Sequence, residues 1–328
     1  MISRRRVVLA LGAAALAPYA TFAQQPRKVW RVGFLSQRHL DFVDADYIYG
    51  PFTQGLRELG YVEGKNLVFE WRSAEGKSER LQELAAELVR LKVDVLATAG
   101  TPASLAAQKA TTTIPVVMTN VGDPVGTGLV KSLARPGGNS TGRSNITADV
   151  GPKLLEMLRS VVPKATRVAF LVRPPTSSLA VLSNVQVAAQ RVGVEIQIVE
   201  ASTPQEIANG FAAMARQNAG GLIVFQDPLF VQQISQIAEL AVEHRLPSIA
   251  ANNEYVEAGG LLSYGANSRE MFRSAATYID KIFKGANPGD LPVEQPTRFE
   301  LFINRKTAKA LGLTIPQELL LRATKVIE

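Results

Sequence analysis

Residues 93–118, with the sequence VDVLATAGTPASLAAQKATTTIPVVM, form one complete unit of an alternating α/β fold. The apolar run at 93–97 predicts a buried strand, residues 101–110 predict a helix, and residues 115–118 predict the next strand. A strand, a helix and a strand at this spacing are typical of a parallel βαβ unit with a right-handed crossover. The stretch therefore predicts an α/β protein built on parallel sheets.

A second unit of the same design lies at residues 221–250, GLIVFQDPLFVQQISQIAELAVEHRLPSIA. In each unit a polar residue and a proline follow the first strand: Thr101 with Pro102, and Asp227 with Pro228. Thr and Asp are favoured helix N-caps and proline is favoured at the first helical position, so we expect both helices to begin there. Both starts then lie at the carboxyl end of a strand, where open α/β sheets bind ligands.

The same alternation continues on either side of the two units. A tight turn at residues 135–138 (RPGG) interrupts it, so we expect two sheets of one design. The strands expected before the turn are 32–35, 67–69, 93–97 and 115–118, and those expected after it are 168–172, 195–199, 222–225 and 248–250. One continuous helix is expected from Phe230 to Val242. The length of 328 residues suits two domains of about 150 residues each.

The first 23 residues resemble an export leader. Arg4, Arg5 and Arg6 form a charged front, residues 7–17 form an apolar run, and Thr-Phe-Ala at 21–23 offers a cleavage site. The apolar run is too short to span a bilayer. We therefore expect a mature chain that begins near residue 24, outside the cytoplasm.

Charge and cysteine content exclude several classes of function. Without the leader arginines, 33 basic residues face 29 acidic ones, a net charge of +4 that gives no nucleic-acid footprint. The chain has no cysteine, which excludes disulfides, a thiolate metal site, a Cys nucleophile and a lipid anchor on cysteine. We expect no cofactor and no metal site.

The two capped helix starts suggest a binding role if the two sheets face each other. The start of the helix at Thr101 favours an anion such as a carboxylate. Asp227 offers the opposite charge, which suits an ammonium group. Together the two residues predict a clamp for a zwitterion, although capping alone explains both residue types.

Several further motifs carry a family resemblance over nearly the whole chain. They are RELGYVEGKN at 57–66, TAGTP at 98–102, VGDPVGTG at 121–128, LARPGGN at 133–139, DPLF at 227–230, GGLLSYG at 259–265 and KTAKALGLTIP at 306–316. With them the chain resembles the ABC-transporter substrate-binding proteins, in the branch whose better-understood members bind tryptophan and related aromatic amino acids. The resemblance implies a type I periplasmic-binding fold, in which two Rossmann-like lobes are joined by a three-segment hinge.

The same resemblance implies the division of the chain. A signal peptide would occupy residues 1–23. The N-terminal lobe would comprise 29–144 plus 265–293, and the C-terminal lobe 145–264 plus 294–328. The three crossings are expected near 143–147, 262–266 and 292–298.

The residues expected to contact the ligand lie in loops at the strand ends. They are Ser36, Gln37, Gly100, Thr101, Thr119, Asn120, Asp123, Asn145, Asp227, Asn253 and Tyr264. Asn120 and Asn253 have an alternative role as turn formers, and Asp123 before Pro124 favours an Asx turn.

The function expected from this resemblance is that of an extracytoplasmic solute-binding protein. It would act as a monomer without catalytic residues, capture a small molecule such as an aromatic amino acid or a related carboxylate, and deliver it to an ABC permease with a cytoplasmic ATPase. One alternative is an exported α/β hydrolase that uses Ser140 of a G-x-S-x-G match at 138–142, with Asp227 and His244. The nucleophile elbow needs a strand before the serine and a helix after it, which this stretch does not predict. Another alternative is a ligand-sensing domain for a membrane kinase, which would close in the same way.

Overall fold

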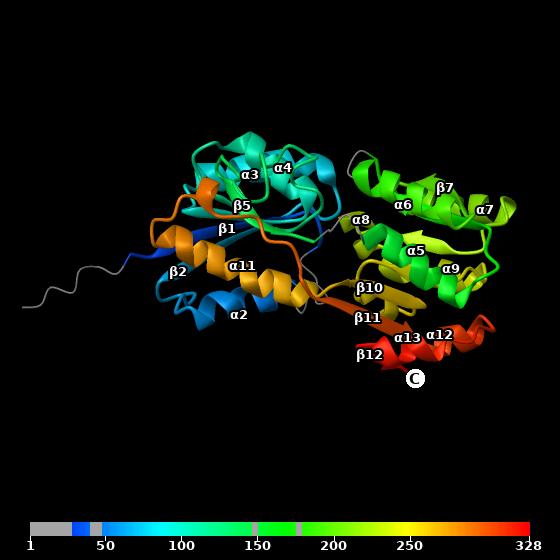
Figure 1. The fold of residues 1–328 in the computed structure, drawn as a ribbon. Coiled ribbons are helices and arrows are strands. Elements are labelled where there is room, and N and C mark those ends of the chain that lie inside the picture. Colours follow the sequence, from blue (N-terminus) through cyan, green and yellow to red (C-terminus); the bar gives the residue numbers. More distant parts are fainter. Residues whose placement is uncertain (1–27, 40–47, 146–149, 175–178) are drawn as a thin grey trace, which may run out of the picture.

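A computed structural model describes residues 28–39, 48–145, 150–174 and 179–328. The expected signal peptide lies outside these residues, and its cleavage stays a prediction. The described residues form two β-sheets, each covered by helices, that lie side by side as two lobes (Figure 1). None of the helices in these ranges combines the length and the apolar character needed to cross a membrane.

The N-terminal lobe contains a five-stranded parallel sheet in the order β2-β1-β3-β4-β5. Its strands are β1 (Trp30–Ser36), β2 (Leu67–Ser73), β3 (Val95–Ala99), β4 (Val116–Val121) and β5 (Ser140–Ser144). Strands β4 and β5 approach each other closely at Gly142. A Cβ atom at this position would lie 2.1 Å from the Met118 carbonyl oxygen. The four strands expected in this lobe are confirmed, but β5 was not expected: it follows the turn at residues 135–138 and still joins the first sheet.

Helices cover both faces of this sheet because their apolar residues recur on one side of each helix. On one face lie α3 (Leu81–Arg90), preceded by the short η2 (Ser78–Arg80), and α4 (Thr101–Ala110). On the other lie α2 (Gly50–Glu58) and α11 (Ser268–Phe283). Figure 1 shows α11 beside α2, although more than 200 residues separate them in the sequence.

The C-terminal lobe contains a seven-stranded sheet in the order β12-β11-β10-β9-β8-β6-β7. Its strands are β6 (Arg167–Val172), β7 (Glu195–Glu200), β8 (Leu222–Val224), β9 (Ser248–Ala250), β10 (Leu262–Ala266), β11 (Phe299–Asn304) and β12 (Lys325–Ile327). All neighbours pair in parallel except β10 and β11.

Two groups of helices cover this second sheet. One face carries α5 (Val150–Val161), α6 (Leu179–Arg191), α12 (Arg305–Ala310) and α13 (Gln317–Arg322), and the other carries α7 (Pro204–Arg216), α8 (Pro228–Gln232), α9 (Ile234–Glu243) and α10 (Glu254–Glu257). The expected single helix at 230–242 is wrong. Gln233 (φ −97°, ψ 23°) leaves the helical conformation and divides it into α8 and α9.

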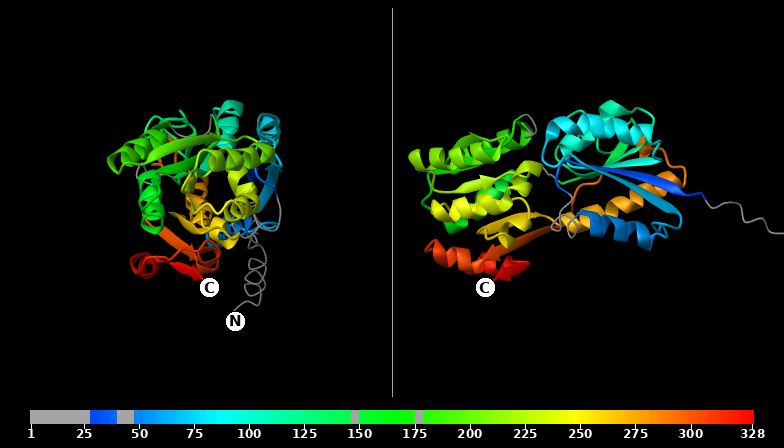
Figure 2. Two further views of the ribbon diagram at one scale, coloured as in Figure 1. Left: turned by 90° about the vertical axis from the view of Figure 1, so that its right-hand side faces the viewer. Right: turned by 180° about the vertical axis from the view of Figure 1, so that it is seen from behind.

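The chain crosses between the lobes after β5, after β10 and before β11. The first and third crossings run side by side, because the Ser144 amide donates to the Glu294 carbonyl at 2.9 Å and the Glu294 amide donates to the Gly142 carbonyl at 3.1 Å. Strand β10 continues in the C-terminal sheet to Ala266, beyond the boundary expected at 264. The views in Figure 2 show the two lobes from other sides. The limits given for the lobes stay a prediction.

Candidate ligand-binding cleft

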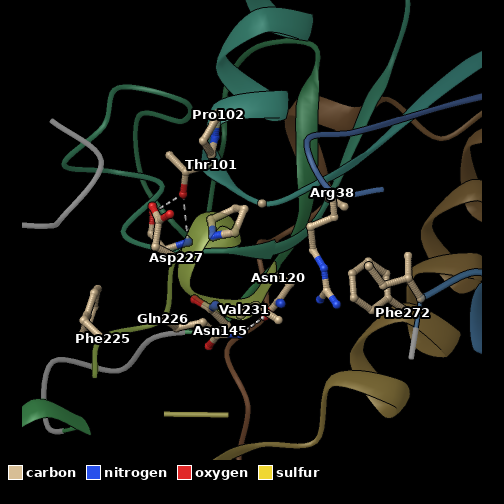
Figure 3. A pocket seen from close by; sticks show the side chains of 15 residues that line it. Arg38, Thr101, Pro102, Asn120, Asn145, Phe225, Gln226, Asp227, Val231 and Phe272 are labelled. Carbon is tan, nitrogen blue, oxygen red and sulfur yellow. Dashed lines mark hydrogen bonds between the residues drawn. The ribbon is translucent and has the colours of Figure 1, made fainter. Parts of the chain in front are cut away.

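A cleft with about 610 Å³ of empty space, part of it open to solvent, lies between the two lobes (Figure 3). Most of its lining residues follow the carboxyl ends of strands, as expected for open α/β sheets. The N-terminal lobe contributes Arg38, Ile48, Ala99, Gly100, Thr101, Pro102, Asn120, Gly122 and Phe272, the first crossing contributes Asn145, and the C-terminal lobe contributes Phe225, Gln226, Asp227, Pro228 and Val231.

One wall of the cleft is the start of α4. The expected N-cap, Thr101, is wrong, because the N-cap of α4 is Gly100. Gly100 has φ +83°, a conformation that glycine adopts without strain. Thr101 is the first helical residue, and its Oγ1 accepts a hydrogen bond from the Gly122 amide at 3.2 Å. Among the described residues no side chain caps α4. The helix start therefore faces the cleft with a favourable potential for an anion.

The opposite wall is the start of α8, where the expected capping by Asp227 is confirmed. Its Oδ1 accepts a hydrogen bond from the Leu229 amide at 2.8 Å, and Pro228 occupies the first helical position. The same oxygen forms an ion pair with Nη1 of Arg173 at 3.2 Å. Only 4% of the Asp227 side chain and 12% of the Arg173 side chain are exposed. The carboxylate is thus already neutralised in part by its own lobe.

Amide side chains lie in the middle of the cleft. Asn120 has a left-handed backbone (φ +56°), and its Oδ1 accepts a 3.4 Å hydrogen bond from Nε2 of Gln226 in the other lobe. Asn145 is 7% exposed, and its Oδ1 has no hydrogen-bond partner among the residues that the structure describes. Because a buried acceptor without a partner is costly, this oxygen is well placed to accept from a ligand.

An arginine and several apolar side chains complete the cleft. In Figure 3 the guanidinium group of Arg38 points into the cleft beside the ring of Phe272, while Phe225 lies at the other side. Arg38 was not predicted as a ligand residue, although Ser36 and Gln37, the two residues before it, were. Ile48 and Phe272 were missed because both also belong to the apolar core of the N-terminal lobe.

Three of the expected ligand residues lie behind the cleft wall and not on its surface. Ser36 is buried, and its Oγ accepts a hydrogen bond from the Arg38 amide at 3.1 Å. Thr119 donates to the Thr98 carbonyl at 2.7 Å. Gln37 is 1% exposed, and within the described ranges neither Nε2 nor Oε1 of its side chain has a hydrogen-bond partner.

Asp123 follows the lining residue Gly122 but does not itself line the cleft. Its Oδ1 accepts a hydrogen bond from the Gly126 amide at 2.8 Å. This bond reaches three residues along the chain and not the two of an Asx turn, so the side chain stabilises a local turn of another kind than expected.

Asn253 and Tyr264 lie near the crossing segments. Asn253 donates to Glu300 at 2.7 Å, and Tyr264 stacks on Phe299 with 5.5 Å between ring centroids. Five of the eleven expected residues thus line the cleft: Gly100, Thr101, Asn120, Asn145 and Asp227.

The three residues of the hydrolase alternative do not meet. Ser140 begins β5 in the N-terminal sheet and is 2% exposed, so it lacks the strand before it and the helix after it. Asp227 is bonded to Leu229 and Arg173, and His244 follows α9 and packs against Phe211. Within the described ranges no group of three His, Cys, Asp or Glu could hold a metal ion.

Two α/β lobes with a cleft between their strand ends define a two-lobed, ligand-binding protein. The family model described as "ABC transporter substrate binding protein" matches residues 41–327. The chain belongs to this family. It is also 30% identical over 264 residues, 80% of this chain and 75% of its relative, to the tyrosine-binding protein of Clostridioides difficile.

Solved structures agree with this assignment. A conserved domain protein from Vibrio cholerae is 29% identical with a TM-score of 0.85, covering 91% of this chain and all of the other. A Streptococcus pneumoniae ABC domain in complex with L-Trp is 25% identical with a TM-score of 0.84, covering 91% and 99%. A ligand-free, open substrate binding protein from Clostridium difficile is 26% identical with a TM-score of 0.66, again covering 91% and 99%. The type I periplasmic-binding fold is thus confirmed, and the family implies a small-molecule ligand and an ABC permease partner.

Proposed function

We propose that this protein captures an aromatic amino acid in the cleft by hinge closure and presents it, unaltered, to its permease. The observation that carries the proposal is the composition of the cleft, which combines opposite charges, amide groups and aromatic rings contributed by both lobes. Two relatives support the ligand class, since one is named a tyrosine-binding protein and another was solved with L-Trp.

Each part of an amino acid has a matching group in the cleft. The start of α4 and the guanidinium of Arg38 suit the carboxylate. Asp227 and the Oδ1 atom of Asn145 suit the ammonium group, which would join the existing pair of Asp227 with Arg173. The ring of Phe272 offers an apolar surface for an aromatic side chain.

Closure would bring the two walls together around the ligand. At nearly equal sequence identity, the chain matches the L-Trp complex with a TM-score of 0.84 and the open, ligand-free structure with 0.66. This difference supports a closed arrangement of the lobes here. Ligand contacts from both lobes exist only in the closed state, so binding shifts the population towards it.

The expected leader places the mature protein in the periplasm, where it would act as a monomer. Residues 1–27 lie outside the described residues, so export rests on the sequence pattern alone. The absence of cysteine supports a protein that is not lipidated.

Thermal unfolding of residues 24–328 in the presence of candidate ligands tests the proposal. We expect L-Trp, L-Tyr or L-Phe to raise the melting temperature, because a ligand at 100 times its Kd adds about 2.7 kcal/mol of stability. Tryptamine and indole-3-propionate, which lack the carboxylate and the ammonium group respectively, should bind at least tenfold more weakly than L-Trp. Mass spectrometry of the recovered ligand should show an unchanged compound. No stabilisation by any aromatic amino acid, or a transformed product, would reject the proposal.

A further inference from the structure

The side chain of Arg173 connects the two lobes beside the cleft. The residue follows β6 in the C-terminal lobe, and its Nη1 donates to Oδ1 of Asp227 at 3.2 Å. Its Nη2 donates to Oγ of Ser78, the first residue of η2 in the N-terminal lobe, at 2.7 Å. One guanidinium group therefore holds a cleft-lining carboxylate and a hydroxyl of the opposite lobe.

The segment that carries Ser78 is itself fixed to the N-terminal wall of the cleft. Oγ of Ser73 donates to the Arg38 carbonyl at 2.6 Å, and the Gly76 amide donates to the Gln37 carbonyl at 2.7 Å. Residues 73–78 therefore move with the end of β1, where Arg38 reaches the cleft.

A second contact between the lobes lies in the same segment. A Cβ on Gly76 would lie 2.9 Å from Oε1 of Gln232 at the end of α8, the helix that Asp227 caps. The loop at 73–78 thus approaches the C-terminal lobe at two points, Ser78 and Gly76. The Ser78 contact reaches Arg173, which is bonded to the lining residue Asp227, and the Gly76 contact reaches α8, which also lines the cleft.

We propose that Arg173 is a positioning residue that orients Asp227 and holds the closed cleft through Ser78. The bond to Asp227 lies within one lobe and persists when the lobes separate. The bond to Ser78 joins the lobes and exists only when they are closed, so it stabilises the closed state in the presence or absence of ligand. Opening the cleft, and therefore releasing the ligand, must break it. The consequence for ligand release rests on the function proposed above, whereas the effect on lobe closure does not.

The strength of this contact predicts a measurable shift. A typical hydrogen bond within a protein changes an equilibrium by about fivefold, and one donated by a charged group by more, so fivefold is the lower bound here. We therefore expect a detectable closed fraction in the ligand-free protein and a slower release of bound ligand. Removing the hydroxyl of Ser78 should lower the ratio of closed to open molecules by about fivefold or more.

Spin-label distances between the lobes test the proposal. Since the chain has no cysteine, Lys109→Cys in α4 and Ser235→Cys in α9, both at exposed positions, place one label in each lobe. The distance distribution is measured for residues 24–328 carrying Ser78 unchanged, Ser78→Ala or Ser78→Thr. Lys77→Ala, at the exposed neighbouring position, is the matched control.

We expect Ser78→Ala to reduce the closed fraction of the ligand-free protein, and Ser78→Thr, which keeps a hydroxyl, to stay within twofold of the parent. Lys77→Ala should also match the parent. A parent protein with open distances only, or a Ser78→Ala protein that behaves like Lys77→Ala, would overturn the proposal. Failure of every amino acid to bind would reject the proposed function while leaving this ligand-free measurement valid.

Discussion

Replacing Asp227 tests the charge arrangement of the cleft. Two substitutions separate the hydrogen bond of Asp227 to the Leu229 amide from its ion pair with Arg173. Asp227→Asn keeps a side chain that caps α8 well, whereas Asp227→Ala removes both the cap and the charge. Loss of the charge leaves the guanidinium of Arg173, which is 12% exposed, without its carboxylate partner. Such a loss costs about 2 to 3 kcal/mol, and loss of the cap costs about 1 kcal/mol more.

We therefore expect Asp227→Asn to lower the free energy of unfolding by about 2 to 3 kcal/mol and Asp227→Ala by about 3 to 4 kcal/mol. Urea denaturation at pH 7 measures both, with Glu239→Gln, an exposed carboxylate of α9, as the control that should stay within about 0.5 kcal/mol.

Calorimetry with the amino acid found in the screen provides the second readout. Both variants should bind it at least tenfold more weakly, because the ammonium group loses its carboxylate partner. Unchanged affinity in Asp227→Asn would refute the ammonium role. Equal stability of Asp227→Ala and Glu239→Gln would refute the energies assigned to the cap and the ion pair.

Three further predictions test other parts of the structure. Asn120→Ala and Asn120→Gly should weaken ligand binding alike, but only Asn120→Ala should lose about 1 kcal/mol of stability, since alanine is strained at φ +56°; equal melting temperatures would contradict this. Gly142→Ala should destabilise the chain by about 3 kcal/mol or more, because its Cβ would collide with the Met118 carbonyl, whereas Gly138→Ala, with no atom within 4 Å, should have little effect in the same denaturation assay. Burial raises the pKa of Tyr61 to about 12, so the unfolded chain releases this proton first and stability should fall between about pH 10 and 12. Tyr61→Phe should lose stability less steeply in that range, and an unchanged slope in denaturation at each pH would contradict the assignment.

Much of the fold could be predicted from local signals. The helix at 101–110 and the strand at 248–250 have the expected bounds, because a Gly-Thr-Pro start and a short apolar run mark them clearly. The break at Gln233 was missed, since the apolar pattern continues through it from α8 into α9. Strand β12 was missed because three residues at a sheet edge carry almost no periodic signal.

The candidate site could be predicted only in part, because a sequence shows which residues follow strands but not where their side chains point. Thr101 and Asp227 line the same cleft, as expected from the repeated unit. Ser36 and Thr119 follow the same rule, yet their side chains bond within their own lobe. Arg173 also follows a strand, so the rule could have found it, but its contact with Ser78 depends on the arrangement of the two lobes.

A crystal structure of the mature protein with its ligand tests the central claim most directly. We predict one amino acid in the cleft, with its carboxylate near the start of α4 and Arg38, its ammonium group near Asp227, and contacts from both lobes. A ligand bound to one lobe only, or at a site away from Thr101 and Asp227, would contradict the account.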